Sequence, residues 1–278
     1  MVRAIKRRLS YNPRLTANDL RSLVPGLDVV SRSHVNKVIL KRCGLPSRIA
    51  VKKPLLTAAT IRRRFDWAKA HRRCTVGDWN TVLWSDESHI ELWIGGAGFH
   101  GRVRRSRRED RYKTKFLRPT VKHPPKLMAW GCFGNGKLGD LVILPQNMRM
   151  NTPLYRNILQ RKLESSFRKT GTDLFMQDGA RCHTSHAMMN WFKENDVDLL
   201  DWPPHSLDMN PIENLWREWK RLLYADFDPP RNLAQLEANM KASWRILGRN
   251  TDLLTNLCES AQRRVRALYE AQGGATKY

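Results

Sequence analysis

The first 30 residues carry apolar positions at the spacing of short helices. A basic amphipathic segment at 2–9 is followed by Asn12 and Pro13, which end it. Thr16 comes next, with Asp19 three residues later, and this spacing is typical of a capping box in which each side chain accepts from the other's backbone. The pattern predicts two short helices, the second ending before Pro25 and Gly26.

A third predicted helix spans 32–42, between a capping Ser31 and a terminating Gly44. Its apolar residues fall at i, i+3 and i+4, and its polar side carries the long donors Arg32, Ser33, Asn36 and Lys37. Two helices, a turn and a polar last helix are typical of a helix-turn-helix, whose last helix enters the major groove of DNA. A generic three-helix packing unit is the alternative, and the density of Arg and Lys favours DNA binding.

Strand-like alternation begins at Asn80. Trp84, Asp86, Ser88 and Ile90 share one parity, so Asp86 points with the apolar set. A carboxylate aimed at a core face is costly unless it is protonated, hydrogen-bonded or bound to a cation. A satisfied structural aspartate is the ordinary interpretation of such a residue taken alone.

Further strands and helices follow along the chain. We expect strands at 126–133, 139–145, 173–178 and 197–203 and helices at 57–72, 153–168 and 185–195. The apolar run Leu174–Met176 suits a buried strand of a mixed sheet, which places Asp178 where that strand ends.

A helix is predicted after Asn210, a possible cap, with Pro211 at its first position. Glu213 lies in its first turn, off the stripe of apolar residues that the helix buries. A capping-box glutamate occupies the same position, so this ordinary role is the alternative to a functional one.

Two carboxylates at strands and one on a helix, Asp86, Asp178 and Glu213, point to metal chemistry when they occur in a basic protein. Three such groups can hold two divalent cations about 3.5–4 Å apart, one activating an attacking oxygen and the other stabilising the leaving oxygen of a phosphodiester. Ligands that are all oxygen favour Mg²⁺ or Mn²⁺.

The charge of the chain is concentrated in two blocks. The 278 residues include 50 Lys and Arg against 26 Asp and Glu, a net charge of +24. Residues 1–76 hold 19 basic and 3 acidic side chains and 102–126 hold 11 and 2, whereas 127–278 hold 20 and 17. Clustered positive charge indicates a track for a polyanion, and it adds Lys52, Lys53, Arg104 and Arg105 to the candidate DNA contacts. A solvated face or a nuclear localisation signal is the alternative for 102–108.

The remaining composition excludes several classes of protein. No apolar run approaches the ~18–20 residues of a membrane span, and the N-terminus lacks the apolar stretch of a secretory signal, so we expect a soluble intracellular protein. The five cysteines are widely spaced and form no Cys-x-x-Cys pair, which argues against a disulfide framework and a zinc module.

Three blocks of sequence together resemble a known family. WSDESH at 84–89, QDGARCHT at 177–184 and HSLDMNPIENLW at 205–216 are similar to the catalytic core of Tc-type DDE transposases of the mariner superfamily. The resemblance implies an α/β fold, a ribonuclease H-like mixed sheet flanked by helices and preceded by a small all-α helix-turn-helix domain. It implies that Asp86, Asp178 and Glu213 are catalytic and bind two Mg²⁺ or Mn²⁺ ions.

The resemblance also implies an activity and partners. The implied activity is cut-and-paste transposition: cleavage of DNA strands at the element ends, followed by strand transfer in which the freed 3′-hydroxyl attacks target DNA. The implied partners are the terminal inverted repeats of the element and the target DNA. The implied protein is a homodimer in the nucleus. Family members begin with two helix-turn-helix units, and we expect this chain to lack the first. A transposase-derived DNA-binding protein that does not cut is therefore the rival hypothesis, and a structure-specific nuclease is a third.

We accordingly expect four regions. They are a helix-turn-helix domain at 1–45, a basic linker at 46–76, a catalytic domain at 77–250 with a basic insert at 96–126, and a C-terminal helix at 251–278. Two departures from the usual family sequence lie beside the second aspartate, where Gly179 and Arg181 replace Asn and Pro.

Overall fold

The computed structural model describes residues 1–50, 53–92, 103–117, 122 and 124–278. The chain forms two compact units, Met1–Lys53 and Pro54–Tyr278, each with a hydrophobic core of its own. The predicted Lys52 contact and part of the predicted basic insert lie outside the described residues.

The N-terminal unit consists of three helices, α1 (Val2–Tyr11), α2 (Ala17–Leu23) and α3 (Arg32–Lys41). Ile5, Leu20 and Val35, one from each helix, are fully buried together. Both halves of the Thr16–Asp19 capping box are formed, and the Ser31 side chain accepts the backbone N–H of His34. The three predicted helices and their caps are therefore confirmed, because these signals are local in sequence.

The second unit is built on one five-stranded mixed sheet with the order β3-β2-β1-β4-β5. Its long strands β1, β2 and β3 are antiparallel neighbours, whereas β4 and β5 run parallel to β1. The strands are β1 (Val82–Glu91), β2 (Lys126–Gly134), β3 (Lys137–Leu144), β4 (Leu174–Met176) and β5 (Asp198–Leu199).

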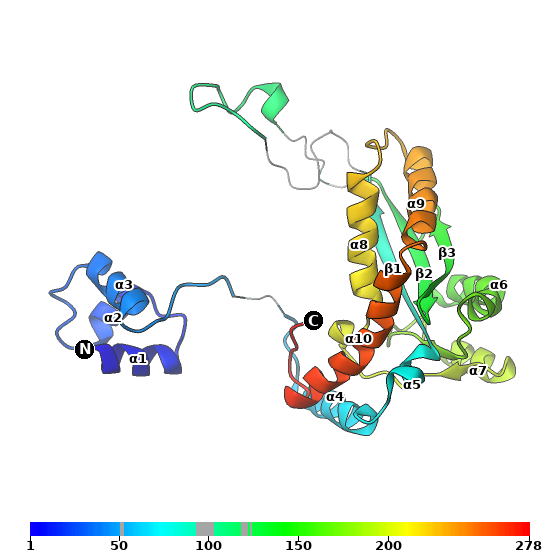
Figure 1. The fold of residues 1–278 in the computed structure, drawn as a ribbon, viewed down its shortest axis with the longest axis horizontal. Coiled ribbons are helices and arrows are strands. Elements are labelled where there is room, and N and C mark those ends of the chain that lie inside the picture. The colour runs from blue at the N-terminus through cyan, green and yellow to red at the C-terminus, as the bar shows by residue number, and fades with distance from the viewer. Residues whose placement is uncertain (51–52, 93–102, 118–121, 123) are drawn as a thin grey trace. The chain divides into compact units, whose positions relative to one another are not determined.

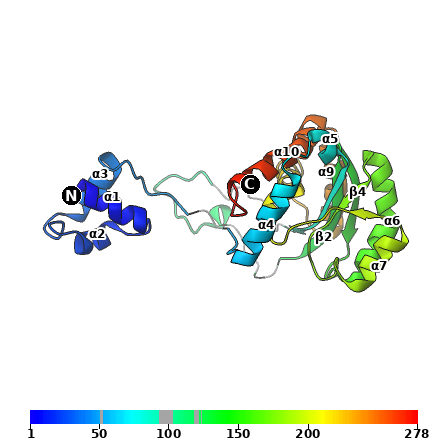
Figure 2. The same ribbon diagram turned by 90° about the horizontal axis from the view of Figure 1, so that it is seen from below.

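Helices cover both faces of this sheet, as Figures 1 and 2 show. On one face lie α6 (Thr152–Thr170) and α7 (His186–Glu194). The other face is covered by α4 (Ala58–His71), α5 (Val76–Asn80), α8 (Ile212–Ala225), α9 (Leu233–Leu247) and α10 (Thr251–Glu270). Two single 3-10 turns, η1 (Thr114–Phe116) and η2 (Leu207–Met209), complete the described elements. The expected mixed sheet flanked by helices is confirmed.

Successive side chains of β1 point to opposite faces of the sheet, and this alternation decides which of them pack into each core. Leu83 packs into the core under α6 and α7, while Trp84 packs into the tryptophan-rich core under α8, α9 and α10. By the same alternation Asp86 lies on the α8 side, with Trp84, and Glu87 lies on the α6 side.

The second unit includes α4, which lies in the segment expected to be a linker. Trp67 is 5% exposed and Ala68 is fully buried in the core that α10 also covers. The Trp67 indole donates to the backbone carbonyl of Asp201 at 2.6 Å. Among the described helices, none has the length and apolarity to cross a bilayer.

Candidate active site

Asp86 sits in the middle of β1, on the face that α8 covers. Its strand partner on β2 is Gly131, and the indole N–H of Trp216 from α8 donates to Asp86 Oδ2 at 3.3 Å. A Cβ on Gly131 would lie 2.8 Å from the Trp216 ring. The absence of a side chain at Gly131 therefore lets Trp216 reach the carboxylate.

Asp178 follows β4 by two residues and is held on one side only. Its Oδ1 accepts the backbone N–H of Ala180 at 2.9 Å and faces Nδ1 of His183 at 2.7 Å. Within the described part of the chain, nothing donates a hydrogen bond to Oδ2. Asp178 thus has one fixed oxygen and one oxygen open to a ligand.

Glu213 lies in the first turn of α8, half-buried, and its side chain makes no hydrogen bond with any described residue. The capping-box alternative is therefore not realised. The helix begins one residue later than predicted, with Pro211 at the N-cap, and it is the side chain of Asn210 that accepts the backbone N–H of Ile212 at 3.2 Å.

Two buried hydrogen bonds join the three segments that carry these carboxylates. Asn210, just before α8, donates through Nδ2 to the carbonyl of Ser85 at 3.4 Å. Ser85 on β1 donates through Oγ to the carbonyl of Met176, the last residue of β4, at 2.8 Å. Asp86 follows Ser85 directly and Asp178 follows Met176 by two, so these bonds hold the acidic residues in a fixed arrangement.

The acidic groups repel one another in this arrangement. Burial, followed by the charges of Glu87 and Glu213, raises the pKa of Asp86 from 3.8 to about 8, and Asp178 adds to the rise. Burial also raises the pKa of Glu213, which the nearby Lys220 lowers and Asp178 raises further. A cation placed among these oxygens would remove that repulsion.

His183 and Glu87 are two site residues that the sequence analysis did not identify. The His183 side chain is 4% exposed, with Nδ1 facing Asp178 and Nε2 lying 3.4 Å from Glu87 Oε1. Its ring stacks on Tyr155 of α6 at 4.0 Å between centroids. Burial lowers the pKa of His183, but the hydrogen bonds and charges of Asp178 and Glu87 dominate and raise it to about 10. His183 is therefore a buried cation between two carboxylates at neutral pH.

Lys220, two turns after Glu213 on α8, was also not anticipated. Its pKa is lowered by burial, against the opposing charges of Glu213, Asp86 and Glu91. The seven-residue spacing, which returns a helix to the same face, is the signal that could have identified it.

The donor set fits Mg²⁺ or Mn²⁺, since all three groups offer carboxylate oxygens. In the conformation described here, no three His, Cys, Asp or Glu side chains of the described ranges are close enough to form a metal site. Burial and the neighbouring carboxylates together raise the pKa of Asp86, and a cation at this position would stabilise its ionised form.

The candidate DNA contacts are distributed over both units. Arg32, Ser33, Asn36 and Lys37 are all exposed on α3, on the side opposite the buried Val35 and Val38. Lys53, Arg104 and Arg105 are exposed as well. Arg181, the residue that departs from the usual family sequence, is exposed beside the site.

Comparisons with known proteins agree with this fold. A family described as "DDE superfamily endonuclease" matches residues 137–236, and a Tc3-type helix-turn-helix family described as "Transposase" matches residues 2–73. The chain is 34% identical to the Transposable element Tcb1 transposase of Caenorhabditis briggsae and 35% identical to the Transposable element Tc1 transposase of Caenorhabditis elegans, in both cases over 100% of each chain. A Mos1 transposase paired-end complex with left transposon end has the same fold, with a TM-score of 0.81 at 14% identity, covering 100% of this chain and 80% of that one.

The fold and the matched families define a DDE-superfamily transposase with an N-terminal helix-turn-helix. With relatives above 30% identity along its whole length, the chain belongs to the Tc1/mariner family of transposases. The expectation that the chain lacks the first N-terminal helix-turn-helix is wrong, because the matched helix-turn-helix family covers residues 2–73 and an N-terminal helix-turn-helix is therefore present.

Proposed function

We propose that this transposase cuts DNA at the ends of its element and joins the freed 3′-hydroxyl to target DNA, with Asp86, Asp178 and Glu213 as the catalytic metal ligands. The observation that carries the proposal is the arrangement of these carboxylates. They lie on one strand, just after a second strand and on a helix, in segments that buried hydrogen bonds join, and burial together with neighbouring like charges raises the pKa of Asp86. Such an arrangement is costly for a purely structural site.

The three residues would hold two Mg²⁺ or Mn²⁺ ions. Bound there, the metal pair would activate the attacking oxygen and stabilise the leaving one. Structures of Mos1 transposase are described with Mn and with Mg, which supports the choice of ion. Asp178 would use its open Oδ2, because its Oδ1 is occupied by Ala180 and His183.

The neighbouring side chains have supporting roles in this proposal. His183 holds Asp178 in one orientation and neutralises Glu87 on the α6 side of β1. Lys220 places a positive charge near Glu213 and Asp86. The Trp216 indole fixes one oxygen of Asp86.

The DNA partners follow from the N-terminal unit and from the relatives. We propose that α3 reads the terminal inverted repeats through Arg32, Ser33, Asn36 and Lys37, with Lys52, Lys53, Arg104 and Arg105 contributing phosphate contacts. Mos1 transposase is described in a paired-end complex, which supports a homodimer that brings two ends together. Action on chromosomal DNA places the protein in the nucleus.

The test is nicking of supercoiled plasmid DNA by the purified full chain with Mg²⁺ or Mn²⁺. We expect Asp86→Asn, Asp178→Asn and Glu213→Gln each to abolish nicking, because each removes a charged metal ligand while nearly preserving side-chain size. Asp173→Asn is the matched control, since Asp173 is an exposed aspartate five residues before Asp178. If the wild-type protein bound DNA but produced no nick with either metal, the non-cutting alternative would replace this proposal.

A further inference from the structure

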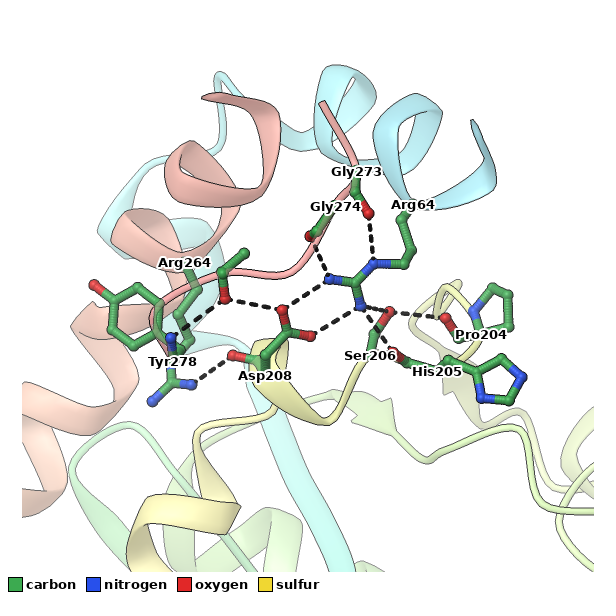
Figure 3. Close-up of polar contacts among 10 residues, drawn as sticks. Arg64, Pro204, His205, Ser206, Asp208, Arg264, Gly273, Gly274 and Tyr278 are labelled. Atoms are coloured by element: carbon green, nitrogen blue, oxygen red, sulfur yellow. Dashed lines mark hydrogen bonds and ion pairs between the residues drawn. The ribbon is translucent and has the colours of Figure 1, made fainter. Parts of the chain in front are cut away.

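The last six residues, Gly273–Tyr278, which we call the tail, dock on α4 through a buried arginine. Figure 3 shows the Arg64 guanidinium between the tail and loop 205–209, the segment that leads toward α8. Arg64 donates to the carbonyls of Gly273 at 2.9 Å and Gly274 at 3.2 Å, and to the carbonyl of His205 at 2.9 Å. Its side chain is 1% exposed, so the tail and the loop together enclose it.

Asp208 is where the tail and the loop meet. Its two carboxylate oxygens accept from Arg64 at 2.8 and 2.9 Å, and the Thr276 hydroxyl of the tail donates to Oδ2 at 2.8 Å. Arg264 of α10 donates to the Asp208 carbonyl at 2.7 Å and lies 4.5 Å from the centre of the Tyr278 ring. Paired and charge-assisted bonds of this kind fix geometry as well as adding stability.

On both sides of this contact a backbone residue has a positive φ angle. Gly273 has φ +82°, and a Cβ there would lie 2.1 Å from the carbonyl oxygen of Ile61 on α4. His205 has φ +52°, a region that residues with a side chain rarely adopt. A backbone of this kind persists only where its surroundings determine it, and the Arg64 bond to the His205 carbonyl supplies such a constraint.

Loop 205–209 is continuous with the candidate active site. It is followed directly by Asn210, which donates to the Ser85 carbonyl beside Asp86 and accepts the backbone N–H of Ile212, the first residue of α8. Four residues separate Asp208 from Glu213 along the chain, and all four are buried: Met209, Asn210, Pro211 and Ile212. A displacement of Asp208 is therefore transmitted to the start of α8.

We propose that the tail is a positioning element of the active site, which fixes loop 205–209 through Asp208 and so sets the place of Glu213 relative to Asp86. Thr276 is the positioning residue of the tail and Arg64 is its counterpart on α4. The inference rests on the proposed function for the role of Glu213. The contacts themselves stand independently of it.

The experiment compares Thr276→Val, which removes the hydroxyl at nearly constant volume, with Thr276→Ser, which retains it. In the full chain, we expect Thr276→Val to raise the Mn²⁺ concentration that gives half-maximal nicking about tenfold, the lower end of the range for lost outer partners of metal ligands, because Thr276 acts on Glu213 only through Asp208 and loop 205–209. Thr276→Ser should restore the wild-type concentration. Ala275→Ser, a change at the exposed neighbouring position, is the matched control.

A second readout uses the metal-free protein. Backbone amides of 205–214 should exchange hydrogen faster in Thr276→Val than in the wild type, while those of β2 remain unchanged. Gly273→Ala should act in the same direction because its Cβ cannot fit against Ile61. Gly171→Ala is its control, since Gly171 has a similar φ of +70° but no atom closer than 3.6 Å.

The outcomes separate the two proposals. If Thr276→Val exchanged faster but kept the wild-type Mn²⁺ dependence, the tail would stabilise the loop without positioning Glu213, and the inference would be overturned. Unchanged exchange in both Thr276→Val and Gly273→Ala would also overturn it. If the wild-type protein failed to nick, the proposed function would fail. The role of the tail would then be decided by comparing the wild type with Thr276→Val for the Mn²⁺ concentration that protects amides 212–216 from exchange, and an equal concentration in both would overturn the inference.

Discussion

Asp86 and Glu87 are adjacent in sequence but face opposite sides of the sheet, and this separates their chemistry. Glu87 Oε1 lies 3.4 Å from Nε2 of the buried cation His183 on the α6 side, an ion pair that lacks hydrogen-bond geometry. Asp86 faces α8, where the nearby groups are further carboxylates and a partly buried lysine. Glu87 therefore faces a cation of the protein, whereas Asp86 faces further carboxylates and the Trp216 indole.

The raised pKa of Asp86 leads to a prediction about stability. The pKa is 3.8 for the ordinary side chain and about 8 in the folded protein, so folding favours the protonated acid. The metal-free wild type should lose stability as pH rises from about 4 to about 8, because only the unfolded state releases this proton, and should level off above that range. Asp86→Asn lacks this penalty, so at about pH 8 it should be more stable than the wild type by at least about 2 kcal/mol.

Thermal or urea unfolding of both proteins in chelator, at several pH values, measures this difference. The advantage of Asp86→Asn should shrink toward about pH 4 and should also shrink when Mg²⁺ is added, because the ion stabilises the ionised wild-type carboxylate. A difference in stability that stayed constant from about pH 4 to pH 8 would contradict the raised pKa.

The sequence predicted the three acidic residues but not their partners. Asp86, Asp178 and Glu213 could be identified because strand parity, a strand end and a first helical turn are local patterns. The Arg64–Asp208 pair joins residues 144 positions apart, and His183 meets Glu87 only after β1 and the segment following β4 come together. No local pattern encodes which cation a given carboxylate will meet.

At the scale of elements, α8 packs against β2 at the point where Trp216 of α8 lies over Gly131 of β2. Gly131 lies opposite Asp86 in the β1–β2 register, and Trp216 occupies the space where its side chain would be. Trp216 in turn packs between Trp219 and Trp244, so it cannot move aside freely. The position of α8 therefore depends on the absence of a Cβ at Gly131.

We predict that Gly131→Ala lowers both stability and activity. The new methyl group would lie 2.8 Å from Trp216 and 3.3 Å from Trp244, and such overpacking of a core costs about 1–3 kcal/mol. Chemical denaturation gives the loss of stability, and the nicking rate at saturating metal should fall because the Trp216 bond to Asp86 is disturbed. Gly77→Ala is the control, since Gly77 lies in α5 and the nearest contact of its Cβ would be the Thr75 hydroxyl at 3.4 Å, an ordinary van der Waals distance.

Wild-type stability and activity in Gly131→Ala would show that Trp216 moves aside without affecting Asp86.

Some elements could be predicted from the sequence without tertiary information. The Thr16–Asp19 box and the Ser31 cap are local signals and specified α2 and α3 correctly. The sheet order β3-β2-β1-β4-β5 and the docking of α4 through Trp67 are set by pairing across long stretches of chain, which hydrophobic periodicity does not encode.

At the scale of the whole molecule, the positive charge is divided unevenly between the two units. Met1–Lys53 contains 13 basic and 2 acidic residues, and the remaining excess lies largely in 102–126. The acidic residues of the candidate site belong to the second unit, where 127–278 is nearly balanced. The proposed DNA contacts and the proposed catalytic residues therefore lie in segments of different charge.

This division predicts how DNA affinity responds to salt. The full chain should bind duplex DNA with an affinity that falls steeply as salt rises, because each Lys or Arg that neutralises a phosphate releases counterions. Lys37→Ala on the exposed side of α3 should reduce the slope of log affinity against log salt by about 1. Lys137→Ala, an exposed lysine at the start of β3, is the matched control and should leave the slope unchanged. Fluorescence anisotropy with a labelled duplex in chelator measures both slopes. Equal losses in the two variants would mean that the positive charge acts as a diffuse field, and an affinity insensitive to salt would contradict a phosphate-binding role for the N-terminal unit altogether.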